Sequence, residues 1–200
     1  MREGRFYRFI YRLIFPLMHL LFRIRYRNRD LLPDGPVVLC APHSSMLDPL
    51  FLMYLMGIGR HIRFLAKKEL LQKPILGAIL KAMGVIGLDR GNADVSAIRT
   101  ALNILKSGGI IGIFPEGTRM QKEVAGSAKT GAILLASRSG AKLLPVWLPR
   151  GKRILGKVEI AVGEAYALPR LHGGSEVYQS YADDLMKRIV ALRDEKVSCA

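Results

Sequence analysis

The sequence predicts a single α/β domain in which helices flank a largely parallel, mixed sheet. Short apolar runs alternate along the chain with longer segments of helical periodicity, which is typical of parallel strands joined by helical crossovers. The length of 200 residues fits one compact domain with a substantial core. Half of the residues are apolar and no stretch has low complexity, so the chain is expected to fold rather than to be disordered.

The first 21 residues are expected to form an amphipathic helix that precedes the domain of residues 22–200. Bulky apolar side chains recur there at helical spacing: Phe6, Phe9, Ile10, Leu13, Ile14 and Leu17. Arginines gather on the opposite side: Arg2, Arg5, Arg8 and Arg12. A basic face opposite a bulky apolar face is typical of a helix that lies in a membrane interface. The alternative is a helix that packs against its own domain.

This N-terminal segment is not expected to cross a bilayer or to be removed. Its longest uncharged stretch, residues 13–22, contains Pro16 and is too short to span the hydrocarbon core. No small-residue cleavage site follows it, as a signal peptide requires. Residues 1–30 hold eight arginines against Glu3 and Asp30. We therefore expect attachment to the surface of a membrane, at its cytosolic face.

Seven strands are expected after this helix. In the first, Phe22, Ile24 and Tyr26 alternate with arginines, as in a half-buried strand. A Pro-Asp-Gly-Pro turn at residues 33–36 separates it from the second strand. The remaining strands are short apolar runs, typical of buried parallel strands: 37–41, 62–66, 85–88, 110–114, 143–148 and 158–162.

Helices are expected between these strands. The first begins at Pro49, because proline is tolerated at a first helical position, and it ends at Met56, before Gly57. Asn92 or Asp94 is expected to cap a helix that runs to Lys106. The others are expected from helical periodicity: 67–71, 75–83, 128–137 and a long amphipathic terminal helix at 178–193.

The polar residues with the clearest chemistry follow the ends of predicted strands. His43, Arg90 and the segment 114–119 each come directly after an apolar run. Crevices outside the carboxyl ends of parallel strands are where open α/β sheets bind ligands. The chain has no Gly-x-Gly-x-x-Gly or Gly-Lys-Ser/Thr loop, so nucleotide binding by those routes is not expected.

His43 and Asp48 lie five residues apart in one loop. An imidazole with a carboxylate partner is the arrangement of a general base whose tautomer is fixed and whose cation is stabilised. The alternatives are a loop histidine with satisfied hydrogen bonds and an aspartate that caps the helix at Pro49; the cap and the catalytic role can coexist.

The segment Phe-Pro-Glu-Gly-Thr-Arg at 114–119 places a carboxylate, a hydroxyl and a guanidinium in one loop. The guanidinium of Arg119 suits bidentate binding of a phosphate, and Gly117 permits a positive φ or a close backbone approach. Opposite a general base, this loop indicates proton abstraction from a substrate that carries negative charge. The alternative is a structural turn in which Glu116 pairs with Arg119.

These blocks, in this order, resemble the glycerophospholipid acyltransferase family over about residues 22–165. The family's His-x4-Asp motif is His43 and Asp48, and its second motif is the strand that leads to Arg90. The third and fourth motifs match segments 114–119 and 144–148, and an Ala-Lys-x-x-Leu block stands at 66–70. One departure is Pro42, where the family usually has asparagine before the histidine.

The resemblance implies transfer of a fatty acyl group from a thioester to the sn-2 hydroxyl of 1-acyl-glycerol 3-phosphate, giving phosphatidic acid. It implies His43 as general base with Asp48, and a phosphate site that includes Arg119, Arg90 and Lys67, although Lys68 stands beside Lys67. It also implies that the third-motif loop shapes the acceptor site, with the residues Glu116, Gly117 and Thr118. Other acceptors, such as glycerol 3-phosphate or another lysolipid, and a non-catalytic basic membrane-binding module remain alternatives.

Charge and cysteine content narrow the partners. The net charge of +15 indicates an anionic partner. Nucleic acid is not expected, because the aromatic residues do not form a recognisable stacking module. The acyl donor is expected to be acyl carrier protein, which is acidic, or coenzyme A, which carries phosphates. No metal or other cofactor is expected, since the four histidines and two cysteines lack ligand spacing; two cysteines also fit a reducing cytosol.

Overall fold

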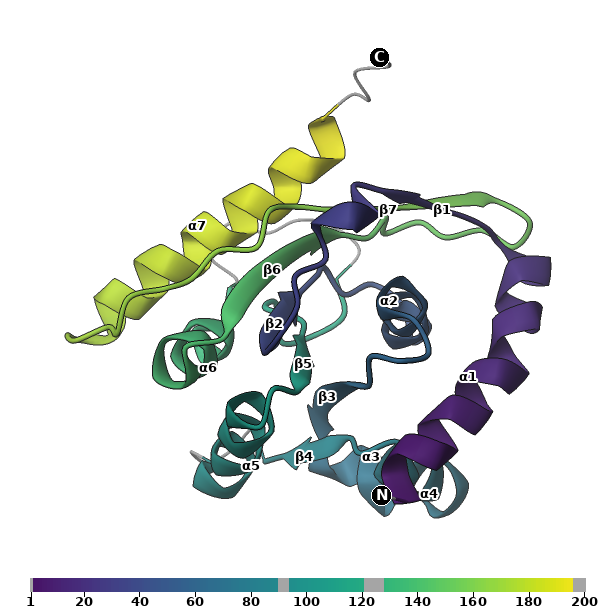
Figure 1. Ribbon diagram of the computed structural model, residues 1–200, viewed down its shortest axis with the longest axis horizontal. Coiled ribbons are helices and arrows are strands. Elements are labelled where there is room, and N and C mark those ends of the chain that lie inside the picture. The colour runs from purple at the N-terminus through teal and green to yellow at the C-terminus, as the bar shows by residue number, and fades with distance from the viewer. Residues whose placement is uncertain (1, 90–93, 121–127, 196–200) are drawn as a thin grey trace.

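The computed structural model describes residues 2–89, 94–120 and 128–195. Its centre is one seven-stranded sheet with the order β1-β7-β6-β2-β5-β3-β4 (Figure 1). All neighbouring strands run parallel except β6 and β7, which are antiparallel. The strands are β1 (Arg23–Arg27), β2 (Val37–Cys40), β3 (Ile62–Lys67), β4 (Ile86–Leu88), β5 (Ile110–Ile113), β6 (Lys142–Trp147) and β7 (Lys157–Val162). The expected fold class, a largely parallel mixed sheet flanked by helices, is confirmed.

Helices cover both faces of this sheet. They are α1 (Arg2–Leu21), α2 (Asp48–Met56), α3 (Lys68–Gln72), α4 (Pro74–Ala82), α5 (Val95–Lys106), α6 (Gly131–Ser139) and α7 (Ser175–Asp194), with a 3-10 turn at Arg29–Leu31. In Figure 1, α1 and α2 lie on one side, while α5, α6 and α7 lie on the other. Side chains of α1 and α2 share one buried cluster and those of α5, α6 and α7 share the second.

The central strand β2 shows why the apolar runs form strands of this sheet. Val37 and Leu39 belong to the cluster under α2, whereas Val38 and Cys40 belong to the cluster under α5 and α6. All four side chains are fully buried. A strand covered on both faces needs apolar residues at every position, because successive side chains point to opposite faces. The segment after β2 therefore leaves the core at the carboxyl edge of the sheet.

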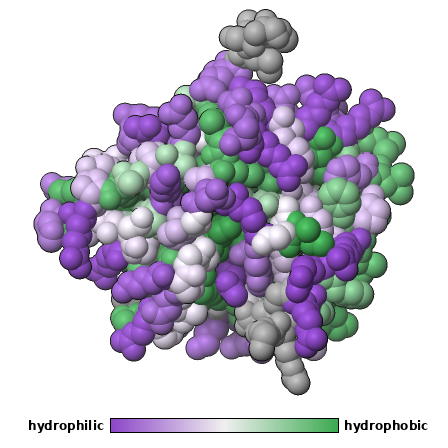
Figure 2. Space-filling model, in the orientation of Figure 1, coloured by the Kyte–Doolittle hydropathy of each residue, from purple (hydrophilic) through white to green (hydrophobic). Residues whose placement is uncertain are grey.

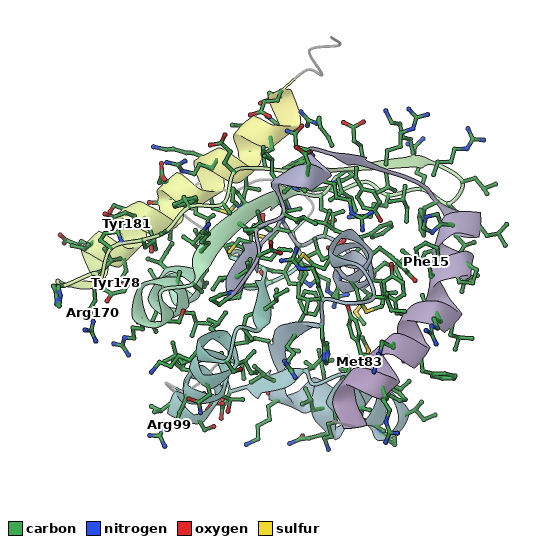
Figure 3. The ribbon with its side chains drawn as sticks, in the orientation of Figure 1. Phe15, Met83, Arg99, Arg170, Tyr178 and Tyr181 are labelled. Carbon is green, nitrogen blue, oxygen red and sulfur yellow. The ribbon has the colours of Figure 1, made fainter. Side chains whose placement is uncertain are left out.

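Helix α1 packs on the domain with one face and presents a second apolar face outward. Tyr7, Ile10 and Met18 are buried in the core cluster under α2, and the ring of Phe15 lies 5.1 Å from that of Tyr54 (Figure 3). The outward face carries apolar side chains that are 50–72% exposed: Phe9, Leu13, Leu17 and Leu20. Figure 2 shows hydrophobic residues gathered along the right-hand edge, where α1 lies in Figure 1.

One of two helix starts agrees with the sequence expectation, and the other differs from it. Asp94 caps α5, since its carboxylate accepts a hydrogen bond from the amide of Ala97 at 3.0 Å; the other candidate, Asn92, lies outside the described residues. The helix expected from residue 128 begins only at Gly131. The reason is that the amide of Lys129 donates to the carbonyl oxygen of Pro115 at 2.7 Å, which ties this stretch to the 114–119 loop.

None of the helices within the described residues has the length and apolar character needed to cross a membrane. The helices α1 and α7 each have 20 residues, but α7 carries charged residues along its length and α1 carries four arginines: Arg2, Arg5, Arg8 and Arg12.

Candidate active site

Three loops from adjacent strands meet at one edge of the sheet. The central strand β2 pairs in parallel with β5 on one side and with β6 on the other. The loops after these strands consequently leave the sheet at the same edge, where α/β sheets bind ligands. They carry, respectively, His43, Glu116 and two cations that sequence analysis did not single out, Arg150 and Lys152.

His43 lies against Asp48 and one aromatic ring. Its Nδ1 is 2.9 Å from Oδ2 of Asp48. Its ring stacks on that of Phe114 with a centroid separation of 4.0 Å, and Phe114 in turn stacks on Phe64. A carboxylate only accepts hydrogen bonds, so the neutral ring carries its proton on Nδ1 and keeps a lone pair on Nε2. No described residue contacts Nε2 through a hydrogen bond, and the side chain of His43 is 19% exposed.

Asp48 is held by four donors although its side chain is fully buried. Oδ2 accepts from Nδ1 of His43 and from the amides of Ser44 and Ser45 at 2.7 and 2.8 Å, and Oδ1 lies 2.7 Å from Nζ of Lys152. Burial alone would raise the pKa of Asp48, but the hydrogen bonds from His43 and Lys152 outweigh it and lower that pKa. Asp48 is therefore an anion in the folded protein.

The prediction that Asp48 caps α2 is wrong. The helix begins at Asp48 itself, and its cap position is Leu47, whose side chain makes no capping hydrogen bond. The carboxylate instead accepts from amides that precede it, at Ser44 and Ser45. These two amides lie in the loop that carries His43, so the same oxygen orders the loop and contacts the imidazole.

Glu116 fixes the backbone of the histidine loop from the other side. It is buried, and its Oε2 accepts a hydrogen bond from the amide of His43 at 3.0 Å. Its carboxylate forms an ion pair with Arg150, whose Nη1 also donates to the carbonyl oxygen of Met120 at 2.6 Å. The amide of Met120 in turn donates a hydrogen bond to the carbonyl oxygen of His43 at 2.7 Å. The alternative in which Glu116 pairs with Arg119 is thus wrong.

Gly117 occupies the sharp point of this loop. Its φ is +70°, a conformation that residues with a Cβ rarely adopt, and its amide donates to the carbonyl oxygen of Phe114 at 2.9 Å. A Cβ built there would lie 3.2 Å from Cγ of Lys129. The backbone conformation therefore favours glycine between Glu116 and Thr118, and a Cβ there would also require a small shift of the Lys129 side chain.

The remaining predicted residues lie on the open side of the site. Thr118 and Arg119 are exposed in the loop after β5, and Lys67 is exposed at the carboxyl end of β3, which pairs in parallel with β5. None of the three side chains forms an ion pair or hydrogen bond with another residue in the part of the chain that the structure describes. Arg90 lies outside the described residues. The open side therefore carries cationic and polar groups that are free to meet a ligand.

Sequence reasoning missed Arg150 and Lys152. The signal was present, because both cations follow the predicted strand 143–148 and hence lie at the same sheet edge as His43. Lys152 is 104 residues from Asp48 along the chain, and nothing local connects the two.

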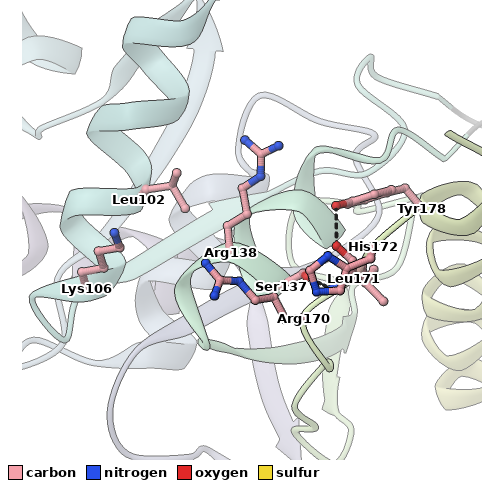
Figure 4. Close-up of a pocket in the computed structure, with 8 residues that line it drawn as sticks. All are labelled: Leu102, Lys106, Ser137, Arg138, Arg170, Leu171, His172 and Tyr178. Carbon is pink, nitrogen blue, oxygen red and sulfur yellow. Dashed lines mark hydrogen bonds between the residues drawn. The ribbon is translucent and has the colours of Figure 1, made fainter. Parts of the chain in front are cut away.

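We also searched the rest of the described structure for metal-ligand clusters and cavities. Within the described ranges, no group of three or more His, Cys, Asp or Glu side chains is placed to hold a metal ion. A cavity of about 370 Å³ lies between α5, α6 and the segment before α7 (Figure 4). Its lining includes Lys106, Arg138, Arg170, His172 and Tyr178, and it contains none of the predicted site residues.

Sequence comparison places the chain among known proteins. The profile of a family described as Acyltransferase matches residues 23–149. The 1-acyl-sn-glycerol-3-phosphate acyltransferase of Bacillus subtilis is 33% identical over 167 residues, which cover 79% of this chain and 81% of that protein. The protein of that name from Pseudomonas aeruginosa is 28% identical over 84% of this chain and 67% of its own. That from Streptococcus pneumoniae is 35% identical, but this chain spans only 45% of its length.

Structure comparison agrees on the fold. The crystal structure of the 1-acyl-sn-glycerophosphate acyltransferase from Thermotoga maritima matches 99% of this chain and 80% of its own with a TM-score of 0.66. The sequence identity in this match is 22%, so the likeness concerns the fold alone. It extends over the sheet, both helical layers and α1.

Proposed function

The chain belongs to the Acyltransferase family, and from that premise we propose that it transfers a fatty acyl group from a thioester to the sn-2 hydroxyl of 1-acyl-sn-glycerol 3-phosphate. The product is phosphatidic acid, and the activity is that of a 1-acyl-sn-glycerol-3-phosphate O-acyltransferase. The observation that carries the proposal is the imidazole of His43, because a buried carboxylate holds one nitrogen and the other is left open. The names of the bacterial relatives support the same reaction.

In the proposed step, His43 acts as general base. Its Nε2 takes the proton of the sn-2 hydroxyl while the hydroxyl oxygen attacks the thioester carbonyl carbon and forms a C–O bond. The tetrahedral intermediate then collapses, the C–S bond breaks, and the departing sulfur takes the proton back from the imidazolium. The products are the ester and a free thiol, and neutral His43 is restored. Asp48 holds the tautomer and stabilises the imidazolium between the two proton transfers.

The acceptor phosphate is proposed to bind the open side of the site. Arg119 and Lys67 are exposed cations at the carboxyl ends of neighbouring parallel strands, and neither is paired with another described residue. Arg90 is assigned to the same phosphate by the family's motif. Glu116, Gly117 and Thr118 shape the wall between this phosphate site and His43. A guanidinium gives two parallel hydrogen bonds to a phosphate, whereas an ammonium acts as a point charge.

The donor is proposed to be a thioester of acyl carrier protein or of coenzyme A. Both are anionic, and the net charge of +15 favours the encounter with either. The acceptor is a lipid, so the reaction is proposed to take place at the cytosolic face of a membrane. Helix α1 supports this location, since apolar Phe9, Leu13 and Leu17 and basic Arg5 and Arg12 are all exposed on it.

The transfer itself is tested with purified protein in detergent. Labelled acyl–carrier protein and acyl–coenzyme A are each offered with 1-acyl-glycerol 3-phosphate, glycerol 3-phosphate or lysophosphatidylcholine. The expected result is labelled phosphatidic acid from at least one donor, and little product from lysophosphatidylcholine, whose phosphate is a diester that carries a choline cation. Transfer only to glycerol 3-phosphate would move the proposal to another member of the family. Lysolipid binding without any transfer would favour a non-catalytic membrane-binding module.

The membrane contact is tested by substitutions on the outer face of α1. Deleting the helix is a poor test, because Tyr7, Ile10 and Met18 belong to the core. Leu13→Gln and Leu17→Gln change only exposed positions, and each inserted leucine contributes about 1.5 kcal/mol, or about tenfold in vesicle binding. The matched control is Val95→Gln, an equally exposed apolar residue on the other face of the sheet. Unchanged binding of both leucine variants to anionic vesicles would place the membrane surface elsewhere.

A further inference from the structure

Lys152 makes three contacts in the site. Its Nζ lies 2.7 Å from Oδ1 of Asp48 and 3.2 Å from Oγ of Ser44, and it faces the ring of Phe51 with 5.8 Å to the ring centre. Only 4% of the side chain is exposed. An ammonium in such a place loses most of its hydration, and among these contacts the carboxylate beside it offers the one opposite charge that offsets the loss.

Lys152 and His43 share one carboxylate. Lys152 approaches Oδ1 of Asp48, and Nδ1 of His43 approaches Oδ2. While the imidazole is neutral, the single negative charge of Asp48 is balanced by the single positive charge of Lys152. When the imidazole takes a proton, the same buried carboxylate has two cations against it. Like charges around one site disfavour the second protonation.

We propose that Lys152 is a positioning residue for the acyl transfer, which acts through Asp48 to keep His43 unprotonated in the resting enzyme. The inference rests on the proposed function, because it assigns a role within that reaction. If no cation balanced the charge of the buried aspartate, the neighbouring histidine would bind a proton tightly. The protonated imidazole has no free lone pair, so it could not act as a general base. The lysine balances the aspartate in advance, so the imidazole is free to accept the proton of the hydroxyl.

The other charged groups around His43 do not have this effect. On the loop after β5, Glu116 contacts the amide of His43 and is already paired with Arg150 from the loop after β6. Arg119 on the same β5 loop is exposed, so solvent screens it. The β3 side offers the apolar ring of Phe64 through Phe114. Within the described residues, Lys152 is therefore the cation whose charge meets the carboxylate that His43 uses.

The pKa directions agree with this arrangement. Burial lowers the pKa of Lys152, and the carboxylate of Asp48 works against that decrease. The pKa of Asp48 is lowered because its hydrogen bonds to His43 and Lys152 outweigh its burial. The anionic form of Asp48 thus depends on both partners.

The test compares pH profiles of kcat/KM for Lys152→Gln, Lys152→Arg and the parent protein. Lys152→Gln keeps a hydrogen-bond donor near Asp48 but removes the charge, so the acid-side midpoint of the profile should rise by about one pH unit. Lys152→Arg keeps the charge and should leave the midpoint close to that of the parent. The matched control is Arg153→Met, which removes an exposed cation from the same loop and should leave the midpoint unchanged.

A merely structural role gives a different result. Lys152→Gln would then lower kcat or stability with the acid-side midpoint unchanged, and this would overturn the proposal. If Lys152→Gln does not fold, Lys152→Met gives the same comparison, because it keeps most of the length of the side chain without its charge. The acid-side midpoint should again rise, and an unchanged midpoint would overturn the proposal.

Nuclear magnetic resonance separates this proposal from the proposed function. The ring signals of His43 are followed against pH without any substrate and assigned by their loss in His43→Gln. If no donor and acceptor pair gives transfer, the proposed reaction fails, but the ring titration in Lys152→Gln should still move upward. If the parent enzyme is active but the ring titration of His43 is the same in Lys152→Gln as in the parent, the proposed role of Lys152 is wrong and the proposed function stands.

Discussion

The two halves of the site use their charges in opposite ways. In the buried half, Asp48 and Glu116 are each neutralised by a cation from the loop after β6, and both touch the loop of His43. In the open half, Arg119 and Lys67 are exposed and meet no partner among the described residues. Charges that neutralise one another hold geometry, whereas charges left open attract a ligand. We therefore expect damage to the first half to appear in kcat and stability, and damage to the second in KM.

The largest effect on kcat is expected at His43, the proposed general base. His43→Ala should lower kcat by about 10²- to 10⁴-fold, as removal of a general base does, with little change in the free energy of unfolding. Its activity is compared with that of His172→Ala, which changes an exposed histidine near the cavity of Figure 4. A folded His43→Ala protein with near-normal turnover would remove His43 from the mechanism.

The next effect tests whether the buried half is held by its ion pairs. Arg150→Met leaves Glu116 buried without its partner, which should reduce the free energy of unfolding by about 3–5 kcal/mol. Denaturant titration measures this loss. Arg138→Met removes an exposed arginine from α6 and should change stability by less than about 0.5 kcal/mol. Equal stability of the two variants would mean that the buried half does not depend on the Glu116 pair.

A smaller effect of a different kind is expected in the open half. Arg119→Met should raise the KM of the acceptor about 10- to 100-fold, because a hydrogen bond to a charged group contributes about 1.5–3 kcal/mol. The KM of the donor and the free energy of unfolding should barely change, since Arg119 has no partner in the described structure to lose. Arg119→Lys should restore only part of the affinity. A rise in the donor KM alone would assign Arg119 to the thioester instead.

The smallest effect is expected at Lys67. Lys67→Met should raise the acceptor KM only a few-fold, because Lys68 is also exposed and stands beside it. The double variant Lys67→Met/Lys68→Met should then raise it further than the sum of the two single effects in free energy. Strict additivity would show that the two lysines do not replace one another at the phosphate.

The fold class could be predicted from the sequence because each strand is a short run of apolar residues that is visible without knowledge of its neighbours in space. The run from Val37 to Cys40 is apolar at every position, as a strand covered on both faces must be. The pair of His43 and Asp48 was predictable for a similar reason, since five residues of one loop separate them. The ion-pair partner of Glu116 could not be predicted in this way, because Arg150 is 34 residues away in the chain and no local pattern connects the two.

The N-terminal helix shows a second limit of local patterns. Its spacing indicated one apolar face, drawn through residues such as Phe9 and Leu13. The structure places Tyr7 and Met18 in the core on a different face, so the helix has two apolar faces with different neighbours. A periodic pattern says that a face will be covered, but what covers it depends on the whole fold.

The proposed membrane contact of α1 would couple folding to lipid, because the helix packs with two faces. Its inner face supplies core residues, including Tyr7 and Met18, and its outer face leaves Leu13 and Leu20 in water. Anything that binds the native state but not the unfolded chain raises the melting temperature by mass action. A bilayer that takes up the outer face would then act as a stabilising ligand for the domain. Without lipid, the same exposed leucines would favour self-association. How long the protein stays dispersed in solution would then depend on whether another apolar surface, such as detergent, covers them.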